Sequence, residues 1–553
     1  GLAQQMLTPA GQLLTLQEAA RRVQGGLSAW KGLADKPELL QEALRLIDEC
    51  KTCAVAPETL FAAAEESEDA VLAEKLSDLA QILTAYERLC EESLPDPRDR
   101  LTHLRDRLAE SHTLDGAAVY LDGFLGFTVQ ESAVVDAMLA AGVPLSAAVT
   151  CDTDYPEIFL TGCKTVQKLT RMAKHHNQTV ERIELGESKV ARPAGLAALE
   201  RESLLPVRTP QESATGVRLY EAASPFDECE HAAAYIRRKV RDEGARCRDF
   251  VVAARDIEPY SAFLAMAMAR YDIPVFLAEK PDLLSRPPMA LVTNALEAVR
   301  NHFRYEDLFS CLKTGLAGLD WDEIDKLENY VLTWNIRGGA WEREWTEHPD
   351  GYGLSIDENA KAQLAELNTL RKRAIAPFSA LREALAGEQP AGDCVRALYA
   401  FLLAVDAPQR MTDRAAGHEQ AGRLQLADEY RQLWEILVSA MEQFVWVCGD
   451  MPLTLDRFAQ LFRLVLGEYD VGTIPVSLDR VTCGNIERAC TENAKYVILL
   501  GVNDGLIPKT PSSTSLLSDM DRDKMDALGV ELKAYGEERL LMEKHVDYAV
   551  EAL

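Results

Sequence analysis

Two regions in which short apolar runs alternate with amphipathic helices constrain the fold more than any other feature of the sequence. In the first region, an apolar run at 117–121 ends on Asp122-Gly123, and a second run follows at 145–149 after a helix expected over 129–141. Apolar runs of this length are typical of strands buried in a parallel sheet. The alternation of strand and helix therefore predicts a parallel sheet with helices on its faces.

The alternation continues and then starts again after a polar, Pro-containing stretch. Because it restarts, the pattern resembles that of a two-domain motor. Further strands are expected over 180–185, 217–220, 250–254, 273–277, 479–482 and 495–501, with helices over 228–241 and 260–270.

Two long stretches, 1–110 and 286–475, carry apolar residues at spacings of three and four, which predicts amphipathic helices. The chain has 553 residues, whereas a single hydrophobic core usually stops growing at roughly 250–300 residues. We therefore expect two sheet-containing domains with large helical insertions.

The chain is strongly acidic, with a formal net charge of −29. A protein that binds DNA by itself usually presents a basic face, because neutralised phosphates supply most of the affinity. Any DNA contact here would need a local basic track or a partner protein. The compact basic clusters are Arg237-Arg238-Lys239 and Arg371-Lys372-Arg373, and each is predicted to be a solvated helix face.

The twelve cysteines are scattered, which favours free thiols in a reducing cytosol over a disulfide framework. The one close pair, Cys50 and Cys53, has no second pair to complete a four-ligand zinc site. No apolar run approaches the roughly 20 residues of a membrane span, and no leader is evident. We expect a cytoplasmic protein without membrane contact. Because the chain begins at Gly1 and stops at Leu553 within a helical pattern, we expect a fragment.

The segment 120–124, Tyr-Leu-Asp-Gly-Phe, is the most informative motif. In nucleotide-driven motors a buried strand ends in an Asp that holds the Mg²⁺ shell, and the next residue is a Glu that polarises the attacking water. Here Gly123 follows Asp122. The sequence also contains no Gly-x-x-x-x-Gly-Lys-[Ser/Thr] loop to bind the β- and γ-phosphates. These two departures predict that the chain hydrolyses no ATP.

At this point the chain resembles the AddB/RexB family of ATP-dependent helicase/deoxyribonucleases, a branch similar to UvrD-like helicases. Leu121-Asp122-Gly123-Phe124 and 127–131 resemble a decayed Asp-Glu-Phe-Gln-Asp…Gln motif. Three further segments agree in order, and 485–490 is typical of the AddB/RexB family. They are 150–155, where Tyr155 replaces the Gln that senses nucleotide and DNA; 251–255, with Arg255 opening the second motor domain; and 480–482 with 500–508, a Gly-x-x-x-Gly-x-x-Pro tail.

The resemblance implies an α/β fold with two RecA-like domains of the P-loop NTPase type. Asp122 and Arg255 would be vestigial nucleotide-binding residues, and no catalytic or metal-binding residue is assigned. The expected division is 1–110, a helical insertion of the first domain; 111–205, the remainder of that domain; 206–285, the first part of the second domain; 286–475, a helical insertion; and 476–553, the last part of the second domain.

The resemblance also implies a function. The chain would be the helicase-like scaffold region of one half of a heterodimeric helicase–nuclease that resects double-strand DNA breaks for recombination. Its partner would be the AddA-type helicase–nuclease, with DNA as the common ligand. ATP with Mg²⁺ and an iron–sulfur cluster are implied for the full-length complex. No cofactor is expected in this chain, which we expect to be inactive as an enzyme by itself.

Three alternatives remain open. The first is an active UvrD-like helicase truncated before its phosphate loop, although truncation does not explain Gly123. The second is a non-enzymatic interaction scaffold, and the third is an unrelated two-domain α/β protein. Asp526 with Glu531-Leu532-Lys533 mimics the spacing of metal-dependent nucleases. We interpret it as structural, because it follows a helix and Gly529 and not paired strands.

Overall fold

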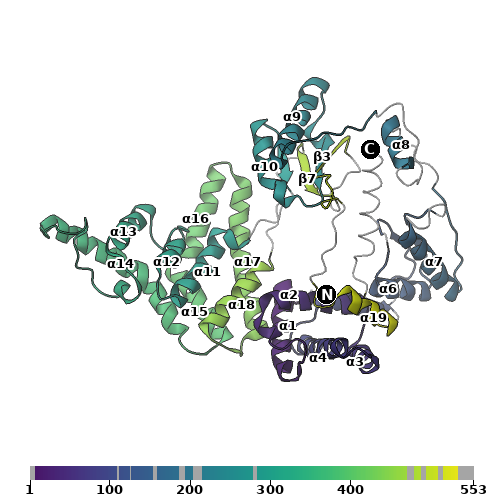
Figure 1. Cartoon of the computed structure of the whole chain (residues 1–553), viewed down its shortest axis with the longest axis horizontal. Helices are drawn as coiled ribbons and strands as arrows, with labels where there is room; N and C mark the ends of the chain where they lie inside the picture. The colour runs from purple at the N-terminus through teal and green to yellow at the C-terminus, as the bar shows by residue number, and fades with distance from the viewer. Residues whose placement is uncertain are drawn as a thin grey trace. The chain divides into compact units, whose positions relative to one another are not determined.

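The protein is a mostly helical α/β chain that contains a four-stranded parallel sheet (Figure 1). It forms two compact units, a helical unit (1–44, 81–97, 280–474) and a sheet unit (45–80, 98–279, 475–553). A computed structural model describes residues 6–108, 111, 113–124, 126–152, 159–185, 193–202, 215–277, 283–469, 479–486, 494–507 and 515–532.

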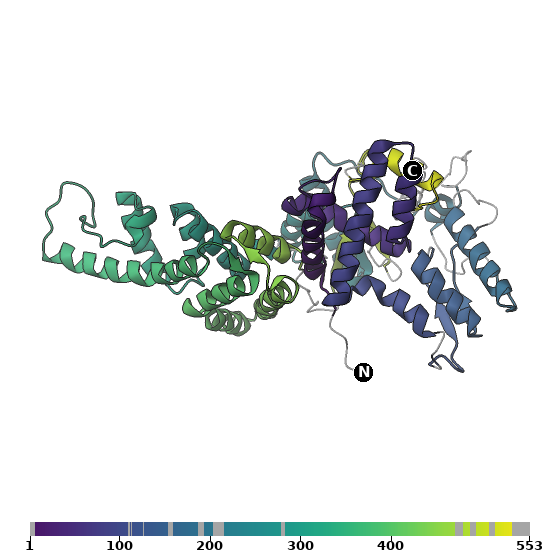
Figure 2. The same cartoon turned by 90° about the horizontal axis from the view of Figure 1, so that it is seen from below.

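The helical unit is built largely from the predicted helical stretch 286–475 (Figure 2). Its core contains fully buried rings, among them Trp341, Phe378 and Phe444. The prediction that this stretch is helical is confirmed. The elements are α1 (Pro9–Val23), α11 (Pro287–Arg300), α12 (Tyr305–Leu312), α13 (Trp321–Trp334), α14 (Glu358–Ala384), β5 (Gln389–Pro390), α15 (Ala391–Ala404), α16 (Ala407–Gln420), α17 (Leu424–Cys448), β6 (Pro452–Leu453) and α18 (Leu455–Gly467).

The stretch 1–110 is also helical, as predicted, and two of its helices contribute residues to both units. Its remaining elements are α2 (Pro37–Thr52), α3 (Pro57–Glu66), α4 (Ala70–Glu92) and α5 (Arg100–Leu108).

The described residues of the sheet unit form two parallel sheets. The first pairs β1 with β2, and the second has the order β4-β7-β3-β8. The elements are β1 (Val119–Leu121), α6 (Val129–Ala140), β2 (Leu145–Ala147), α7 (Leu160–His175), α8 (Ala194–Glu202), α9 (Pro225–Glu243), β3 (Phe250–Ala254), α10 (Glu258–Arg270), β4 (Val275–Leu277), β7 (Val481–Asn485), β8 (Tyr496–Leu500) and α19 (Asp519–Ala527).

Helices α9 and α10 cover one face of the four-stranded sheet. Alternate residues of the strands point to that face, because side chains in a strand alternate between its two faces. Phe250 and Val252 of β3 are fully buried there together with Ile236 of α9 and Leu264 of α10. On the opposite face of the sheet, Val497 is half-exposed. Apolar burial against the two helices therefore fixes the register of the central strand.

Two predicted strands are wrong. The described residues at 180–185 and 217–220 belong to no strand. Their apolar side chains lie in water, with Ile183 72%, Leu185 84% and Leu219 78% exposed. β-Branched and aromatic residues favour a strand only where they can pack on a half-buried pleated surface, and the described residues offer these two runs no such surface.

Candidate functional site

Asp122 lies directly after β1, at the carboxyl edge where open parallel sheets place their ligands. Its Oδ1 accepts a hydrogen bond of 2.9 Å from the backbone N–H of Gly123, and both residues are exposed. Gly123 has φ of +78°, and a Cβ at this position would meet no atom within 4 Å. The backbone conformation, more than space, therefore favours glycine at position 123, where the resemblance to motor proteins predicts a Glu.

The segment after Asp122 begins helix α6 with a capping box. Thr128 Oγ1 accepts a 3.1 Å hydrogen bond from the N–H of Glu131, and Glu131 Oε2 accepts one of 2.8 Å from the N–H of Thr128. Gln130 donates through Nε2 to the carbonyl of Arg98. Thr128 and Glu131 thus accept hydrogen bonds from backbone N–H groups at the start of α6.

The carboxyl end of β2 is tied closely to α7. A Cβ on Gly162 would lie 1.9 Å from the carbonyl oxygen of Thr150, so only glycine allows this approach. The approach places Cys163 Sγ 3.1 Å from Cys151 Sγ, and burial, followed by the contact with Cys163, raises the pKa of Cys151 to about 11. Tyr155, the predicted replacement for the sensing Gln, lies outside the described residues.

Arg255 lies at the carboxyl edge of the second sheet, directly after β3, and is half-buried. Asp122 and Arg255 therefore end strands of two different sheets. Next to Arg255, the N–H of Ile257 donates 2.9 Å to Oδ1 of Asn485, which joins the end of β7 to the start of α10.

A partly buried polar cluster at the same edge was not identified from the sequence. Ser224 caps α9, which places Glu228 in the first turn of that helix. Glu228 Oε1 accepts a 2.7 Å hydrogen bond from the N–H of Gly501, and its carboxylate also bonds the hydroxyl of Tyr260. Burial, followed by the nearby Glu228 charge, raises the pKa of Tyr260 to about 12.

Of the two glycines in the late motif, Gly501 has a geometric reason in this cluster. Gly501 has φ of +68° and Gly505 has φ of +79°. A Cβ on Gly501 would lie 2.5 Å from the Tyr260 hydroxyl oxygen. The sequence signal for this site was the spacing of the two glycines after an apolar strand. Nothing in the sequence indicated that Glu228 and Tyr260 contact Gly501.

The two basic clusters behave differently from each other. Arg237 and Arg238 are exposed on α9, as predicted, and Lys239 pairs with Glu243 at 2.7 Å. The prediction of a solvated face is wrong for Arg371, which is 3% exposed. Its guanidinium donates to the carbonyl of Trp341 at 2.6 Å and to Asn368 at 3.1 Å. These bonds compensate for burial of the charge, and burial lowers the pKa of Arg371.

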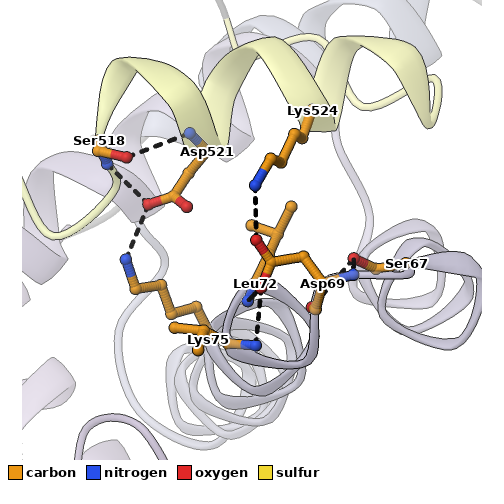
Figure 3. A network of polar contacts seen from close by, with 8 residues as sticks. Ser67, Asp69, Leu72, Lys75, Ser518, Asp521 and Lys524 are labelled. Carbon is orange, nitrogen blue, oxygen red and sulfur yellow. Dashed lines mark hydrogen bonds and ion pairs between the residues drawn. The ribbon is translucent and has the colours of Figure 1, made fainter.

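Asp526, the first residue of the nuclease-like spacing, lies in α19 and not on a strand, as predicted. Helix α19 is held by charged contacts to residues around the start of α4 (Figure 3). Lys75 Nζ lies 2.7 Å from Asp521 Oδ2, and Lys524 Nζ lies 2.6 Å from Asp69 Oδ2. Lys533 lies outside the described residues. These contacts dock α19, the helix in which Asp526 lies.

The described part of the chain offers neither a metal cluster nor a membrane helix. No group of three or more His, Cys, Asp or Glu side chains there could hold a metal ion. Among its helices, none combines the length and apolar character that crossing a membrane requires.

Comparison with known proteins gives consistent matches. Residues 1–200 match the family described as ADDB, N-terminal. A relative from Acetivibrio thermocellus is 31% identical over 547 residues, covering 96% of this chain and 48% of the relative. One from Desulforamulus reducens is 30% identical over 567 residues, covering 99% of this chain and 49% of the relative.

A third relative, from Thermoanaerobacter sp., is 28% identical over 560 residues, covering 99% of this chain and 49% of the relative. All three proteins are named as the B subunit of an ATP-dependent helicase/deoxyribonuclease. The chain spans about half the length of these curated relatives. With similarity that runs through nearly all of its residues, the chain belongs to the AddB family.

Proposed function

We propose that this chain is the helicase-like scaffold region of the AddB subunit of a heterodimeric ATP-dependent helicase–nuclease. The observation that carries the proposal is the similarity of nearly the whole chain to proteins named as that subunit. In the proposed complex, an AddA-type partner supplies the working motor, and the complex resects double-strand DNA breaks for homologous recombination. The present region binds and channels DNA.

The proposal includes two RecA-like domains with the boundaries 1–110, 111–205, 206–285, 286–475 and 476–553. Two features support it. Each parallel sheet has helices packed on one face, and the strands of the four-stranded sheet are contributed from both sides of the helical stretch 286–475.

The scaffold role requires that the chain does not turn over ATP. Asp122 is exposed and Gly123 offers no side chain to orient a water molecule. The residues at this edge therefore do not fit hydrolysis, although ATP with Mg²⁺ is implied for the family. The described cysteines likewise form no cluster that could hold an iron–sulfur group, so we assign no chemistry of that kind to them.

Phosphate release in the presence of single-stranded DNA tests the proposal. We expect none, whereas turnover near the ~1–100 s⁻¹ of typical phosphoryl-transfer enzymes would overturn it. The variant Gly123→Glu, made in a form of the protein that is extended at its N-terminus, sharpens the test. Because φ at this position is +78°, a Glu there is strained, and we expect no gain of hydrolysis. Vigorous ATP hydrolysis by this variant would show that activity was lost through the change at position 123 alone.

We further propose Asp122 and Arg255 as remnants of a nucleotide site. A ligand that binds the native state raises the melting temperature with its concentration. Titration of Mg²⁺–ATP during thermal unfolding of the same N-terminally extended form therefore tests whether binding persists without turnover. A shift that is lost in both Asp122→Ala and Arg255→Ala supports a retained site, and no shift at millimolar nucleotide makes both residues purely structural.

A further inference from the structure

The connection between α16 and α17 in the helical unit forms an open hollow. Its volume is about 460 Å³, and it is lined by Arg414, Gly417, His418, Arg423 and Tyr430. This volume falls in the range of roughly 300–1,000 Å³ that is usual for small-molecule sites. Gly417 has no atom within 4 Å of the position that a Cβ would take, so this side of the hollow stays open.

The hollow is cationic although the chain is strongly acidic. Within the part of the chain that the structure describes, no carboxylate forms an ion pair with Arg414 or Arg423. The nearby carboxylates have other partners: Glu419 and Asp428 pair with Arg431, and Glu429 pairs with Arg286. Two guanidinium groups therefore face the hollow without a neutralising protein charge.

The guanidinium of Arg414 is held in place by neutral groups. Its Nη1 donates 3.3 Å to the hydroxyl of Tyr430. On its other side lies Gly315, where a Cβ would come within 2.1 Å of Arg414 Nη2. Gly315 thus leaves room for the guanidinium. Holding a charged group in advance reduces the entropy lost when a ligand binds.

The hollow also presents planar rings. His418 and Tyr430 lie with their ring centroids 5.5 Å apart and their planes inclined by 32°. Guanidinium groups recognise phosphate through paired hydrogen bonds, and aromatic rings stack on bases with little sequence preference. The two kinds of group occur side by side here.

We propose that this hollow binds a nucleoside phosphate, with the phosphate on Arg414 and Arg423 and the base against Tyr430 and His418. A nucleotide unit within a nucleic-acid strand and a free nucleotide both present a phosphate together with a base. The site lies outside the sheet edges considered above. Its test is therefore independent of whether the chain turns over ATP.

The experiment uses the full chain and three probes. Fluorescence anisotropy follows binding of a labelled oligo-dT, and calorimetry follows binding of dTMP and of inorganic phosphate. Arg414→Gln and Arg423→Gln remove one charge each from the hollow. Arg396→Gln is the matched control, because it removes the same charge from an exposed residue of α15 outside the hollow.

We expect each hollow variant to weaken binding at least about tenfold, since hydrogen bonds to charged groups are among the stronger ones, while the control binds normally. If the hollow variants weaken the binding of oligo-dT, the result supports a nucleic-acid strand as the ligand. If they weaken the binding of dTMP, the result supports a free nucleotide. Equal binding by the hollow variants and the control overturns the proposal. If the chain binds inorganic phosphate but neither dTMP nor oligo-dT, the proposed contacts of the base with Tyr430 and His418 are overturned.

A second measurement guards against a folding defect. An oligonucleotide that carries photoreactive 5-iodouracil should cross-link to Tyr430 in the unaltered chain, as read by mass spectrometry. Tyr430→Phe keeps the ring and removes the hydroxyl that holds Arg414, so we expect the affinity to fall less than in Arg414→Gln. Cross-linking confined to residues outside the hollow would contradict the proposal that the hollow binds a nucleic-acid strand.

Discussion

The two parallel sheets of the sheet unit differ in how well their strands are covered. In the four-stranded sheet, all five residues of β3 are buried, and the strand has a neighbour on each side. In the two-stranded sheet, the middle residue of β1, Tyr120, is 77% exposed. Among the described residues, the neighbouring Leu121 packs against a small core of α6 and α7 residues. The comparison indicates that the second sheet contributes much more to stability than the first.

The largest expected effect tests this difference directly. Phe250→Ala removes a fully buried ring that stacks on Tyr496 at 4.7 Å, and we expect a loss of about 3–5 kcal/mol. Tyr120→Ala removes an exposed ring, and we expect a change within about 0.5 kcal/mol. Hydrogen exchange of the strand amides, read by mass spectrometry, measures both local opening energies. Equal effects would show that the two sheets are not distinct in stability.

A pair of glycines gives the next effect. Gly501 and Gly123 both have positive φ, and alanine there is strained by roughly 1–2 kcal/mol. In Gly501→Ala the new Cβ also meets the Tyr260 hydroxyl, so we expect a total loss of about 2–4 kcal/mol. Gly123→Ala meets no neighbour within 4 Å and should show the strain alone.

The same exchange measurement separates strain from contact. Adding Tyr260→Phe to Gly501→Ala removes the hydroxyl that the Cβ meets, and we expect part of the loss to be recovered. If the double variant is as unstable as the sum of the two single variants, the contact with Tyr260 does not explain the requirement for glycine.

Tyr260 provides a pH-dependent effect that is specific to the second sheet. Its folded pKa of about 12 lies above its ordinary value of 10.0. The neutral phenol is therefore favoured by folding, and the stability that it contributes is present below pH 10 and is lost as the pH rises towards 12. Tyr260→Phe should flatten this dependence in β3 and β8.

A substitution at Glu228 refines this prediction. Burial is the first cause of the raised pKa and Glu228 the second, so Glu228→Gln should lower the pKa of Tyr260 without returning it fully to 10.0. Carbon-13 NMR of labelled tyrosine, assigned with Tyr260→Phe, gives the value. An unchanged pKa would exclude a role for the Glu228 charge.

Part of this architecture was predictable from local pattern alone. The strands at 119–121 and 250–254 were expected from apolar runs of five residues each, but the runs did not distinguish the exposed strand from the buried one. Burial depends on which other segments pair with a strand, and that information is not local. The wrong strands at 180–185 and 217–220 fail for the same reason, since no strand in the described part of the chain pairs with them.

The candidate site shows the same limit. Asp122 and Arg255 were located because each follows an apolar strand directly. The contact between Glu228 and Gly501 joins residues 273 positions apart, so no spacing in the sequence indicates it. Arg371 was misplaced because a run of three basic residues is usually solvated, whereas its partner, the Trp341 carbonyl, comes from a different helical segment.

The smallest effect concerns the side chains that follow the strands of the two sheets. Asn485 ends β7, and its half-buried Oδ1 accepts a hydrogen bond of 2.9 Å from Ile257. Asn485→Ala leaves that N–H without its partner, and we expect a loss of about 1–2 kcal/mol. Asp122 makes a bond of the same length to Gly123, but in water, so Asp122→Ala should change stability by no more than about 0.5 kcal/mol. Solvent can replace the carboxylate in the second case, whereas Ile257 is buried. A loss at Asp122 as large as that at Asn485 would mean that Asp122 has a structural partner beyond Gly123, and its interpretation as a nucleotide-site remnant would then be replaced by a structural one.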